Sequence, residues 1–370
     1  MNVTTCSSDR LGDTWPQLPS EIPKTMTAVT FREFGGPEVL QQETLPVPEI
    51  GPNDVLVRVA AVSVGRLLDL AARSGKHPYA SFSFPHVLGA EHAGIVAAVG
   101  SSVTHVARGN RIAVFPVVVD GEDELTRAGY SELSELVQLI GTHRQGAYAE
   151  YSAVPASNVT KVPANVTPRE AVAVALAGAV ANNQFDRAGG IGPGSRVIVQ
   201  GATSALGSTT ALLAKYLGAQ VIVSSRYQDK REKLRALGFE HVLDGVEPRF
   251  VDEVHAVFGP EGANVIIDNL GSPMVWEHGM QVLARGGTIV SSGAFLGHQV
   301  PLNLQRLYSL GQRIVGVRTG NHTSVAKLWR QVENGFRSVS DKAFLLEDAS
   351  LAHEYVERGD NVGRVCLVVP

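Results

Sequence analysis

The chain has 370 residues, 44% of them hydrophobic, which is enough to bury substantial cores and to form two domains. Its formal net charge of −4 gives no electrostatic basis for binding nucleic acid or anionic membranes. No apolar run reaches the roughly 18 residues that a membrane-spanning helix needs, so we expect neither nucleic-acid nor membrane partners.

The first segment, residues 1–24, is polar, contains prolines and lacks the hydrophobic core of a signal peptide. We expect these residues to form a flexible N-terminal extension. The chain has two cysteines, Cys6 in this segment and Cys366 near the end. Two cysteines cannot build a disulfide framework or a cysteine-based zinc site, and their scarcity fits a reducing compartment. We therefore expect a cytoplasmic protein.

Two sequence patterns divide the rest of the chain. Residues 25–60 and 86–119 contain short apolar runs separated by glycine and proline, a spacing that predicts an antiparallel, barrel-like domain. From about residue 168, helical segments alternate with apolar strands, which predicts a parallel sheet covered on both faces. We expect an α/β protein with a doubly wound Rossmann domain at 174–316. The barrel-type catalytic domain is expected at 25–173 and 317–370.

Residues 197–226 carry the most specific motif. An apolar strand is followed by a turn of small residues, a helix and a second strand, which is the context of a dinucleotide-binding fingerprint. Small side chains let the backbone approach a pyrophosphate, which the free amides of the helix start then bind. The alternative is an ordinary βαβ unit that binds nothing. The residues predicted to bind the cofactor phosphates are Gly201, Ala202, Thr203, Ser204, Ala205, Leu206 and Gly207.

The end of the second strand indicates which dinucleotide binds. Chains that bind NAD usually have a carboxylate there, whereas this chain has Ser225 and Arg226, with Lys230 one helical turn on. A hydroxyl and a guanidinium would bind a 2′-phosphate through charge-assisted hydrogen bonds. This pattern predicts NADPH as the cofactor. The alternative is that Arg226 and Lys230 belong to a solvated helix face.

Nearly the whole chain from residue 25 resembles the medium-chain dehydrogenase/reductase superfamily. The motifs occur in order as FGGPEVL, LGAEHAGIVAAVG, VARGNRIAVF, GAYAEY, the fingerprint turn, IIDNLG, ARGGTIVSSG and VGRVCLVV. Together they resemble its zinc-independent branch, which contains quinone oxidoreductases and 2-enoyl reductases. The resemblance implies a GroES-like catalytic domain, a small-molecule substrate and a homodimer paired through a sheet-edge strand in 297–317.

The positions of the catalytic zinc ligands in related enzymes are substituted in this chain. Zinc-dependent relatives have Cys three residues before an Asp, where this chain has Arg66 before Asp69. Their Gly-His-Glu triplet is Gly-Ala-Glu at residues 89–91, and no cysteine occurs at 140–190. His92 is near the lost ligand position, but a lone histidine is more often packed or exposed than metal-binding. We predict no bound metal.

The resemblance also implies other site residues. Arg66 is a candidate for binding an oxyanion or a carboxylate, and Tyr79 for donating a proton, with a packed loop aromatic as the alternative. Asn182 is on the helix leading into the nucleotide domain, near the expected nicotinamide, with a solvent-facing helix end as the alternative. Further cofactor-binding residues implied by the resemblance or by strand ends are Asn269, Gly293, Ala294 and Arg364.

These features predict a zinc-independent, NADPH-dependent oxidoreductase that transfers hydride to an activated C=C bond or a quinone. Without zinc, a carbonyl has lost its Lewis acid, whereas a conjugated acceptor spreads its charge onto a distant oxygen that hydrogen-bond donors can stabilise. One alternative is an NADPH-dependent aldehyde or ketone reductase. Another is a non-catalytic NADPH-binding protein, such as a redox sensor or structural protein.

Overall fold

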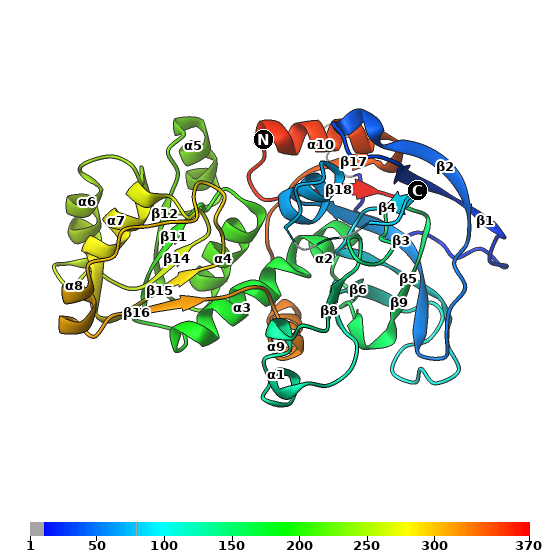
Figure 1. The fold of residues 1–370 in the computed structure, drawn as a ribbon, viewed down its shortest axis with the longest axis horizontal. Helices are drawn as coiled ribbons and strands as arrows, with labels where there is room; N and C mark the ends of the chain where they lie inside the picture. Colours follow the sequence, from blue (N-terminus) through cyan, green and yellow to red (C-terminus); the bar gives the residue numbers. More distant parts are fainter. Residues whose placement is uncertain (1–10, 79, 81) are drawn as a thin grey trace, which may run out of the picture. The chain divides into compact units, whose positions relative to one another are not determined.

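The computed structural model describes residues 11–78, 80 and 82–370 (Figure 1). The chain divides into two compact units, each described here by itself. Unit 1 consists of Met1–Leu176, Trp329–Gly335 and Val339–Pro370, and unit 2 of Ala177–Leu328 and Phe336–Ser338. The return to unit 1 occurs after Leu328, whereas the sequence predicts it after residue 316. The reason is local packing, because Leu328 lies against Gly178 in unit 2.

Unit 1 is built on mainly antiparallel sheets, as the short apolar runs predict, with one parallel pair, β17 and β18. Within the described residues, its larger sheet has the order β10-β6-β5-β3-β18-β17, with β9 also paired to β3, and a smaller sheet has the order β2-β1-β4. The final strand β18 pairs antiparallel with β3, so the end of the chain returns to this unit as expected. The strands are β1 (Thr25–Phe31), β2 (Gln41–Pro46), β3 (Asp54–Val64), β4 (His86–Val87), β5 (His92–Val99), β6 (Arg111–Val114), β7 (Val117–Val119), β8 (Val137–Leu139), β9 (Tyr151–Pro155), β10 (Val159–Lys161), β17 (Ser340–Leu345) and β18 (Arg364–Val368).

Short helices complete unit 1. Before α2, Thr167 and Glu170 form a capping box, and Pro168 starts the helix. Alternating valines and alanines of β3 and its neighbours fill the core between the sheet and the helices. The helices are a π-helical turn (Arg66–Ala71), α1 (Glu124–Arg127), α2 (Pro168–Val174) and α10 (Ala349–Arg358).

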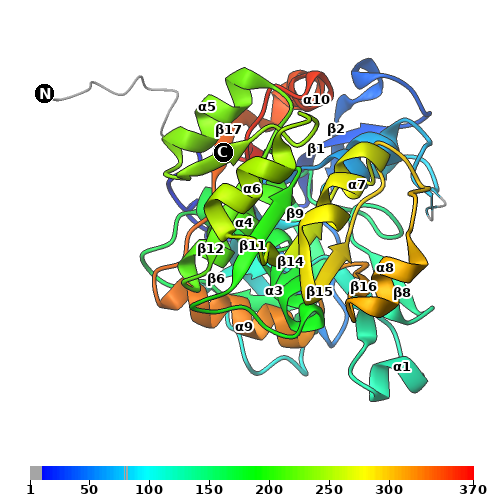
Figure 2. The same ribbon diagram turned by 90° about the vertical axis from the view of Figure 1, so that its left-hand side faces the viewer.

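Unit 2 confirms the predicted Rossmann architecture. Its parallel six-stranded sheet has the order β13-β12-β11-β14-β15-β16, which is the doubly wound order 3-2-1-4-5-6. Helices α3 and α4 pack together on one face, and α6 and α7 on the other (Figures 1 and 2). The elements are α3 (Ala177–Ala188), β11 (Arg196–Gln200), α4 (Ala205–Tyr216), β12 (Gln220–Ser224), α5 (Gln228–Ala236), β13 (His241–Leu243), α6 (Phe250–Phe258), β14 (Ala263–Asp268), α7 (Pro273–Val282), β15 (Leu283–Ser291), α8 (Leu304–Ser309), β16 (Arg313–Gly316) and α9 (His322–Glu333).

The segment before β1 differs from the expected flexible extension. Trp15 donates a hydrogen bond to the carbonyl of Val166 at 3.1 Å, and Arg108 donates to the carbonyl of Pro19 at 2.6 Å. Leu18 also packs against the core of unit 1. Residues 11–24 are therefore anchored to unit 1 by contacts that sequence composition does not reveal, while residues 1–10, with Cys6, lie outside the described residues.

None of the helices in the described part of the chain is long and apolar enough to cross a membrane.

Candidate functional site

The turn between β11 and α4 brings together the residues predicted to bind the cofactor phosphates. Ser204 caps the helix, because its hydroxyl accepts a hydrogen bond from the amide of Gly207 at 3.0 Å. A Cβ atom at Gly207 would collide with the carbonyl oxygen of Gly201, so glycine is required for this close approach of helix to strand. The first amides of a helix lack intrahelical partners and carry the positive end of its dipole. A turn of this geometry can bind a pyrophosphate, as the sequence predicts.

Beyond β12, two cations lie beside an aromatic ring. The guanidinium carbon of Arg226 is 4.8 Å from the centre of the Tyr227 ring, and the ammonium nitrogen of Lys230 is 5.6 Å from it. Both distances are within the range of cation–π contacts. The ring itself is exposed, and Ser225 precedes this group at the end of the strand. The three residues predicted to select the cofactor thus lie together, and Tyr227 joins them.

A neighbouring arginine has a different role. Arg231 donates from Nη1 to the carboxylate of Asp244 at 2.7 Å and to the carbonyl of Ser225 at 2.8 Å. It therefore holds the end of β12 to the end of β13. The sequence alone does not show that Arg231 pairs with Asp244, whereas Arg226 and Lys230 lie beside the Tyr227 ring.

The loops after β14 and β15 place three more predicted residues at the same end of the sheet. The amide of Ser292 donates to the carbonyl of Asp268 at 2.9 Å, and Gly293 leaves no room for a Cβ atom against the carbonyl of Asn269. Asn269, Gly293 and Ala294 are therefore close together beyond the carboxyl ends of parallel strands. Ligands of open α/β sheets bind at this end.

Two further candidates from the sequence, Asn182 and Tyr79, have different outcomes. Asn182 is fully buried in α3, and its amide donates to the carbonyl of Gly178 at 3.1 Å. The alternative that it marks a solvent-facing helix end is therefore wrong, because the residue lies inside unit 2. Tyr79 lies outside the described residues.

In unit 1, Arg364 forms a buried ion pair that no local sequence pattern indicates. Its Nη1 is 2.6 Å from Oε1 of Glu91, and both side chains are almost completely buried. Burial raises the pKa of Glu91, while the guanidinium of Arg364 acts in the opposite direction. The nearby Asp69 accepts hydrogen bonds from the amides of Gly65 and Gly89, yet burial raises its pKa to about 7. Two buried acids thus lie near one arginine.

The residues at the family's zinc-ligand positions make other contacts. Nη2 of Arg66 donates to the carbonyl of Val356 and, at 3.4 Å, to that of Glu357, at the carboxyl end of α10. A cation there also complements the helix dipole. Ala90 is fully buried. His92 lies 3.2 Å through Nδ1 from the carbonyl of Ala90, and burial lowers its pKa to about 4.

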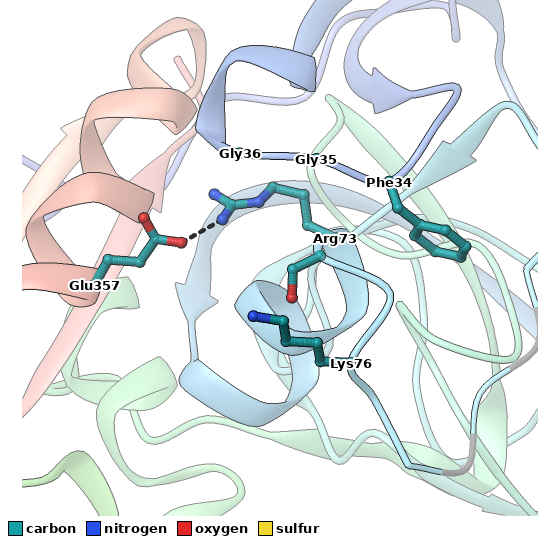
Figure 3. Close-up of a pocket in the computed structure, with 7 residues that line it drawn as sticks. Phe34, Gly35, Gly36, Arg73, Lys76 and Glu357 are labelled. Atoms are coloured by element: carbon teal, nitrogen blue, oxygen red, sulfur yellow. Dashed lines mark hydrogen bonds and ion pairs between the residues drawn. The ribbon is translucent and has the colours of Figure 1, made fainter.

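A second polar cluster in unit 1 lies beside a cavity of about 380 Å³ (Figure 3). Arg73 pairs with Glu357, and its Nη1 is 3.2 Å from Nδ1 of His353. Because a guanidinium can only donate, His353 accepts at Nδ1 and donates from Nε2 to the Tyr148 hydroxyl, 3.0 Å away. This cluster fastens α10 to the helical segment that follows Arg66–Ala71 and to the loop before β9. The cavity is lined by Phe34, Gly35, Gly36, Arg73, Ser74, Lys76 and Glu357.

Comparison with known proteins relates both units to one family. Residues 205–334 match the zinc-binding dehydrogenase model, and residues 51–164 match the alcohol dehydrogenase GroES-like domain. The chain is 28% identical to an NAD-dependent alcohol dehydrogenase of Sulfolobus acidocaldarius, over 93% of this chain and 100% of that protein. It is 32% identical to an L-threonine 3-dehydrogenase of Chelativorans sp. (strain BNC1), over 69% of this chain and 74% of that protein. A solved NAD-dependent alcohol dehydrogenase superposes with a TM-score of 0.86 at 33% identity, covering 93% of this chain and 100% of that chain.

These matches confirm the GroES-like and Rossmann fold but overturn the assignment to the zinc-independent quinone oxidoreductase branch. The relatives are alcohol and threonine dehydrogenases, so the expectation of hydride transfer to an activated C=C bond or a quinone is also wrong. The branch was predicted wrongly because the prediction relied on a few substituted zinc-ligand positions. Similarity over nearly the whole chain decides the branch, and it identifies an oxidoreductase family that uses NAD(P).

The residues at the family's zinc-ligand positions can be compared with the ligands that a catalytic zinc ion needs. A catalytic zinc ion needs three protein ligands from cysteine, histidine or carboxylate side chains. Ala90 has no donor atom, and the guanidinium of Arg66 carries only N–H groups. Across the described residues, no group of three or more His, Cys, Asp or Glu side chains could hold a metal ion. These residues therefore do not fit a catalytic zinc ion, and metal content stays a prediction.

Proposed function

The chain belongs to the zinc-containing alcohol dehydrogenase branch of the medium-chain dehydrogenase/reductase superfamily, and we propose that it interconverts an alcohol and an aldehyde or ketone with NADP(H). We infer the type of reaction from the similarity to alcohol dehydrogenases over almost the full chain. The choice of NADPH rests on the end of β12, which has Ser225 and Arg226 where NAD-binding chains usually have a carboxylate.

When bound, the nicotinamide supplies or accepts the hydride at C4. The turn at residues 201–207 binds the pyrophosphate, and Arg226 with Lys230 binds the 2′-phosphate. Asn269, Gly293 and Ala294 line the carboxyl ends of β14 and β15. These residues orient the dinucleotide, which is the part of catalysis that the protein contributes through positioning.

Negative charge develops on the substrate oxygen during carbonyl reduction, and hydrogen-bond donors must stabilise it. Arg66 and Tyr79 are the proposed donors. The described contacts of the Arg66 side chain use Nη2, which leaves its Nε and Nη1 groups to donate to an oxygen. Burial lowers the pKa of Arg66, but an arginine side chain stays charged at neutral pH. Arg364 is the proposed arginine for the pyrophosphate, positioned by Glu91.

The proposed quaternary state is a homodimer formed through unit 2. Strand β16 is the last strand of the sheet, so one of its edges has no partner strand among the described residues. Nearby apolar side chains are exposed, including Tyr308 at 74%, Leu304 at 65% and Phe295 at 60%. An exposed apolar patch beside an open strand edge is a surface that association covers.

A non-catalytic NADPH-binding protein is the second candidate function. The observation that favours it is the replacement of two zinc-ligand positions by Arg66 and Ala90, which removes the Lewis acid that polarises a carbonyl. In this case the phosphate-binding turn and the cations beyond β12 keep their roles. Only the reaction is lost.

The two candidates can be separated with the purified full-length protein. NADPH and NADH oxidation is followed with panels of aldehydes, ketones, enones and quinones, and NADP+ reduction with a panel of alcohols. The first proposal expects NADPH-dependent turnover of an aldehyde or ketone and the reverse reaction with the matching alcohol. Turnover of enones or quinones alone contradicts it. Tight NADPH binding with no turnover on any panel supports the second candidate.

A further inference from the structure

Three neighbouring strands of unit 2 end in polar atoms that the protein leaves unsatisfied. Oε1 of Gln200, Nδ2 of Asn269 and Oγ of Ser292 are buried and have no hydrogen-bond partner within the described residues. Gln200 is the last residue of β11, and Asn269 and Ser292 directly follow β14 and β15, which are adjacent in the sheet. A buried polar group without a partner costs folding free energy. The Gln200 side chain packs against α7, where its Nε2 donates to the carbonyl of Val275 at 2.9 Å. The atoms of Asn269 and Ser292 lie beyond the ends of two adjacent strands, where ligands of such sheets bind, and they indicate a ligand that supplies the partners.

The side chain of Asn269 is oriented by a relay of hydrogen bonds. The hydroxyl of Thr210 in α4 donates to Oε1 of Gln184 in α3 at 3.0 Å. Nε2 of Gln184 then donates to Oδ1 of Asn269, also at 3.0 Å. Thr210 and Gln184 are completely buried, and Asn269 is 5% exposed. The Thr210 hydroxyl identifies which atom of the Gln184 amide is the oxygen, and Nε2 of Gln184 in turn identifies the oxygen of the Asn269 amide. Nδ2 of Asn269 is therefore directed away from Gln184.

The backbone beside Asn269 is held as firmly as its side chain. The carboxylate of Asp268 accepts hydrogen bonds from the amides of Leu270 at 2.9 Å and Gly271 at 3.2 Å, which closes the turn around Asn269. From the other side, Gly293 packs against the Asn269 carbonyl. The N–H donor is therefore preorganised before any ligand arrives, which reduces the entropic cost of binding.

The position of this donor in the sheet indicates which part of the cofactor it meets. The cations Arg226 and Lys230 follow β12, on one side of β11, whereas Asn269 follows β14, on the other side. A dinucleotide that crosses a doubly wound sheet at β11 places one nucleoside over each half. If the 2′-phosphate of the adenosine half lies beyond β12, the nicotinamide nucleoside lies beyond β14.

We propose that Asn269 binds the nicotinamide half of the cofactor by donating a hydrogen bond from Nδ2 to a ribose hydroxyl, with Gln184 and Thr210 as positioning residues. The inference rests on the proposed cofactor, but it concerns a different set of contacts from those that select the 2′-phosphate. It predicts that loss of the relay weakens binding of the whole dinucleotide and spares binding of its adenosine half.

The test compares two ligands by fluorescence or calorimetric titration of the full-length protein. NADPH contains both halves, and 2′,5′-ADP contains only the phosphorylated adenosine half. Asn269→Leu keeps the side-chain size and removes both polar groups. We expect this variant to weaken NADPH about tenfold, the value of one hydrogen bond, and to change 2′,5′-ADP by less than about twofold.

The positioning residues have their own variants and a matched control. Gln184→Met and Thr210→Val break the relay of hydrogen bonds at residues that do not contact the ligand. We therefore expect a smaller loss of NADPH affinity, about threefold, and again little change in 2′,5′-ADP affinity. Gln312→Met is the control, because Gln312 is a buried glutamine of unit 2 that donates to the carbonyl of Leu283, where β15 begins. It should change neither affinity.

The outcomes separate this inference from the proposed function. Equal affinities of wild type and Asn269→Leu for NADPH, or equal losses of NADPH and 2′,5′-ADP, would overturn the role of Asn269. Retained 2′,5′-ADP binding shows that each variant is folded. If wild type binds neither ligand, the proposed NADPH function fails, and this inference fails with it. If wild type binds NADH and ADP instead, the same split between these two ligands supports the role of Asn269 and rejects only the NADPH preference.

Discussion

The guanidinium of Arg226 lies 4.8 Å from the centre of the Tyr227 ring, while the guanidinium of Arg231 is paired with Asp244 at 2.7 Å. Two arginines of one short segment therefore differ in their availability to a ligand. Arg231 is committed to joining the ends of two strands. Arg226 rests on an exposed aromatic ring, where a phosphate can reach it.

Arg226→Ala should selectively weaken NADPH. A hydrogen bond to a charged group is worth roughly 1.5–3 kcal/mol, so the loss should be about 10–100-fold. NADH should change little, because it lacks the 2′-phosphate. The measurement is fluorescence titration with both cofactors at fixed ionic strength. Arg231→Ala is the contrasting variant, which should weaken both cofactors because it loosens the end of β12. Equal losses of both cofactors in Arg226→Ala would contradict its contact with the phosphate.

Ser225→Asp should move the preference toward NADH. The new carboxylate would repel a 2′-phosphate and accept hydrogen bonds from the ribose hydroxyls of NADH. We expect the ratio of NADPH to NADH affinity to fall by about tenfold or more. Ser225→Asn is the control for size, because it adds an amide of similar volume without charge. An unchanged ratio in Ser225→Asp would place the adenosine ribose elsewhere.

Metal content is expected to be far below one zinc per chain. The ligand positions hold Arg66 and Ala90, and the described residues offer no alternative set of metal ligands. Elemental analysis of the purified protein measures this directly, and incubation with a chelator should leave cofactor binding, stability and any turnover unchanged. Stoichiometric zinc that survives extensive dialysis would show that ligands come from an arrangement other than the one described.

Asp69 should make stability depend on pH. Burial raises its pKa to about 7 from an ordinary value of 3.8, so between these values the folded chain holds a proton that the unfolded chain has lost. The stabilisation from Asp69 is therefore full below about pH 4 and is lost as the pH rises through about 7. Asp69→Asn removes this dependence.

Urea unfolding at about pH 5 and pH 8 provides the measurement for Asp69. The free energy of unfolding of wild type, relative to Asp69→Asn, should be lower at pH 8 than at pH 5. Groups common to both proteins cancel in this comparison. Parallel pH profiles for the two proteins would mean that Asp69 titrates near its ordinary pKa in the folded state.

The apolar patch of unit 2 should be a dimer interface. We expect a homodimer at micromolar concentration by light scattering, and Tyr308→Asp should weaken the dimer by placing a charge on the patch. Leu351→Asp is the matched control, since Leu351 is also an exposed apolar residue, at 53%, but lies on α10 of unit 1. A monomeric wild type, or equal effects of both substitutions, would reject this surface.

Local sequence patterns predicted most of the fold. The apolar strand, small-residue turn and helix around Gly201 and Gly207 specify a phosphate-binding turn, because each step depends on residues only a few positions apart. Alternation of helices and strands predicted the doubly wound sheet for the same reason. The branch was predicted incorrectly, because the prediction relied on two positions, Arg66 and Ala90, whereas the branch is decided by similarity along the whole chain.

Thus the sequence by itself determined the fold class, the turn of small residues between β11 and α4 and the basic end of β12, all of which depend on neighbouring residues. Only the tertiary structure decided which partners hold the candidate side chains in place. Arg364 is paired with Glu91, and Gln184 orients Asn269. In both pairs the residues are distant in sequence, so no local pattern records their contact. Buried charges and amides depend on such partners for their orientation and protonation, and only the folded chain brings the partners together.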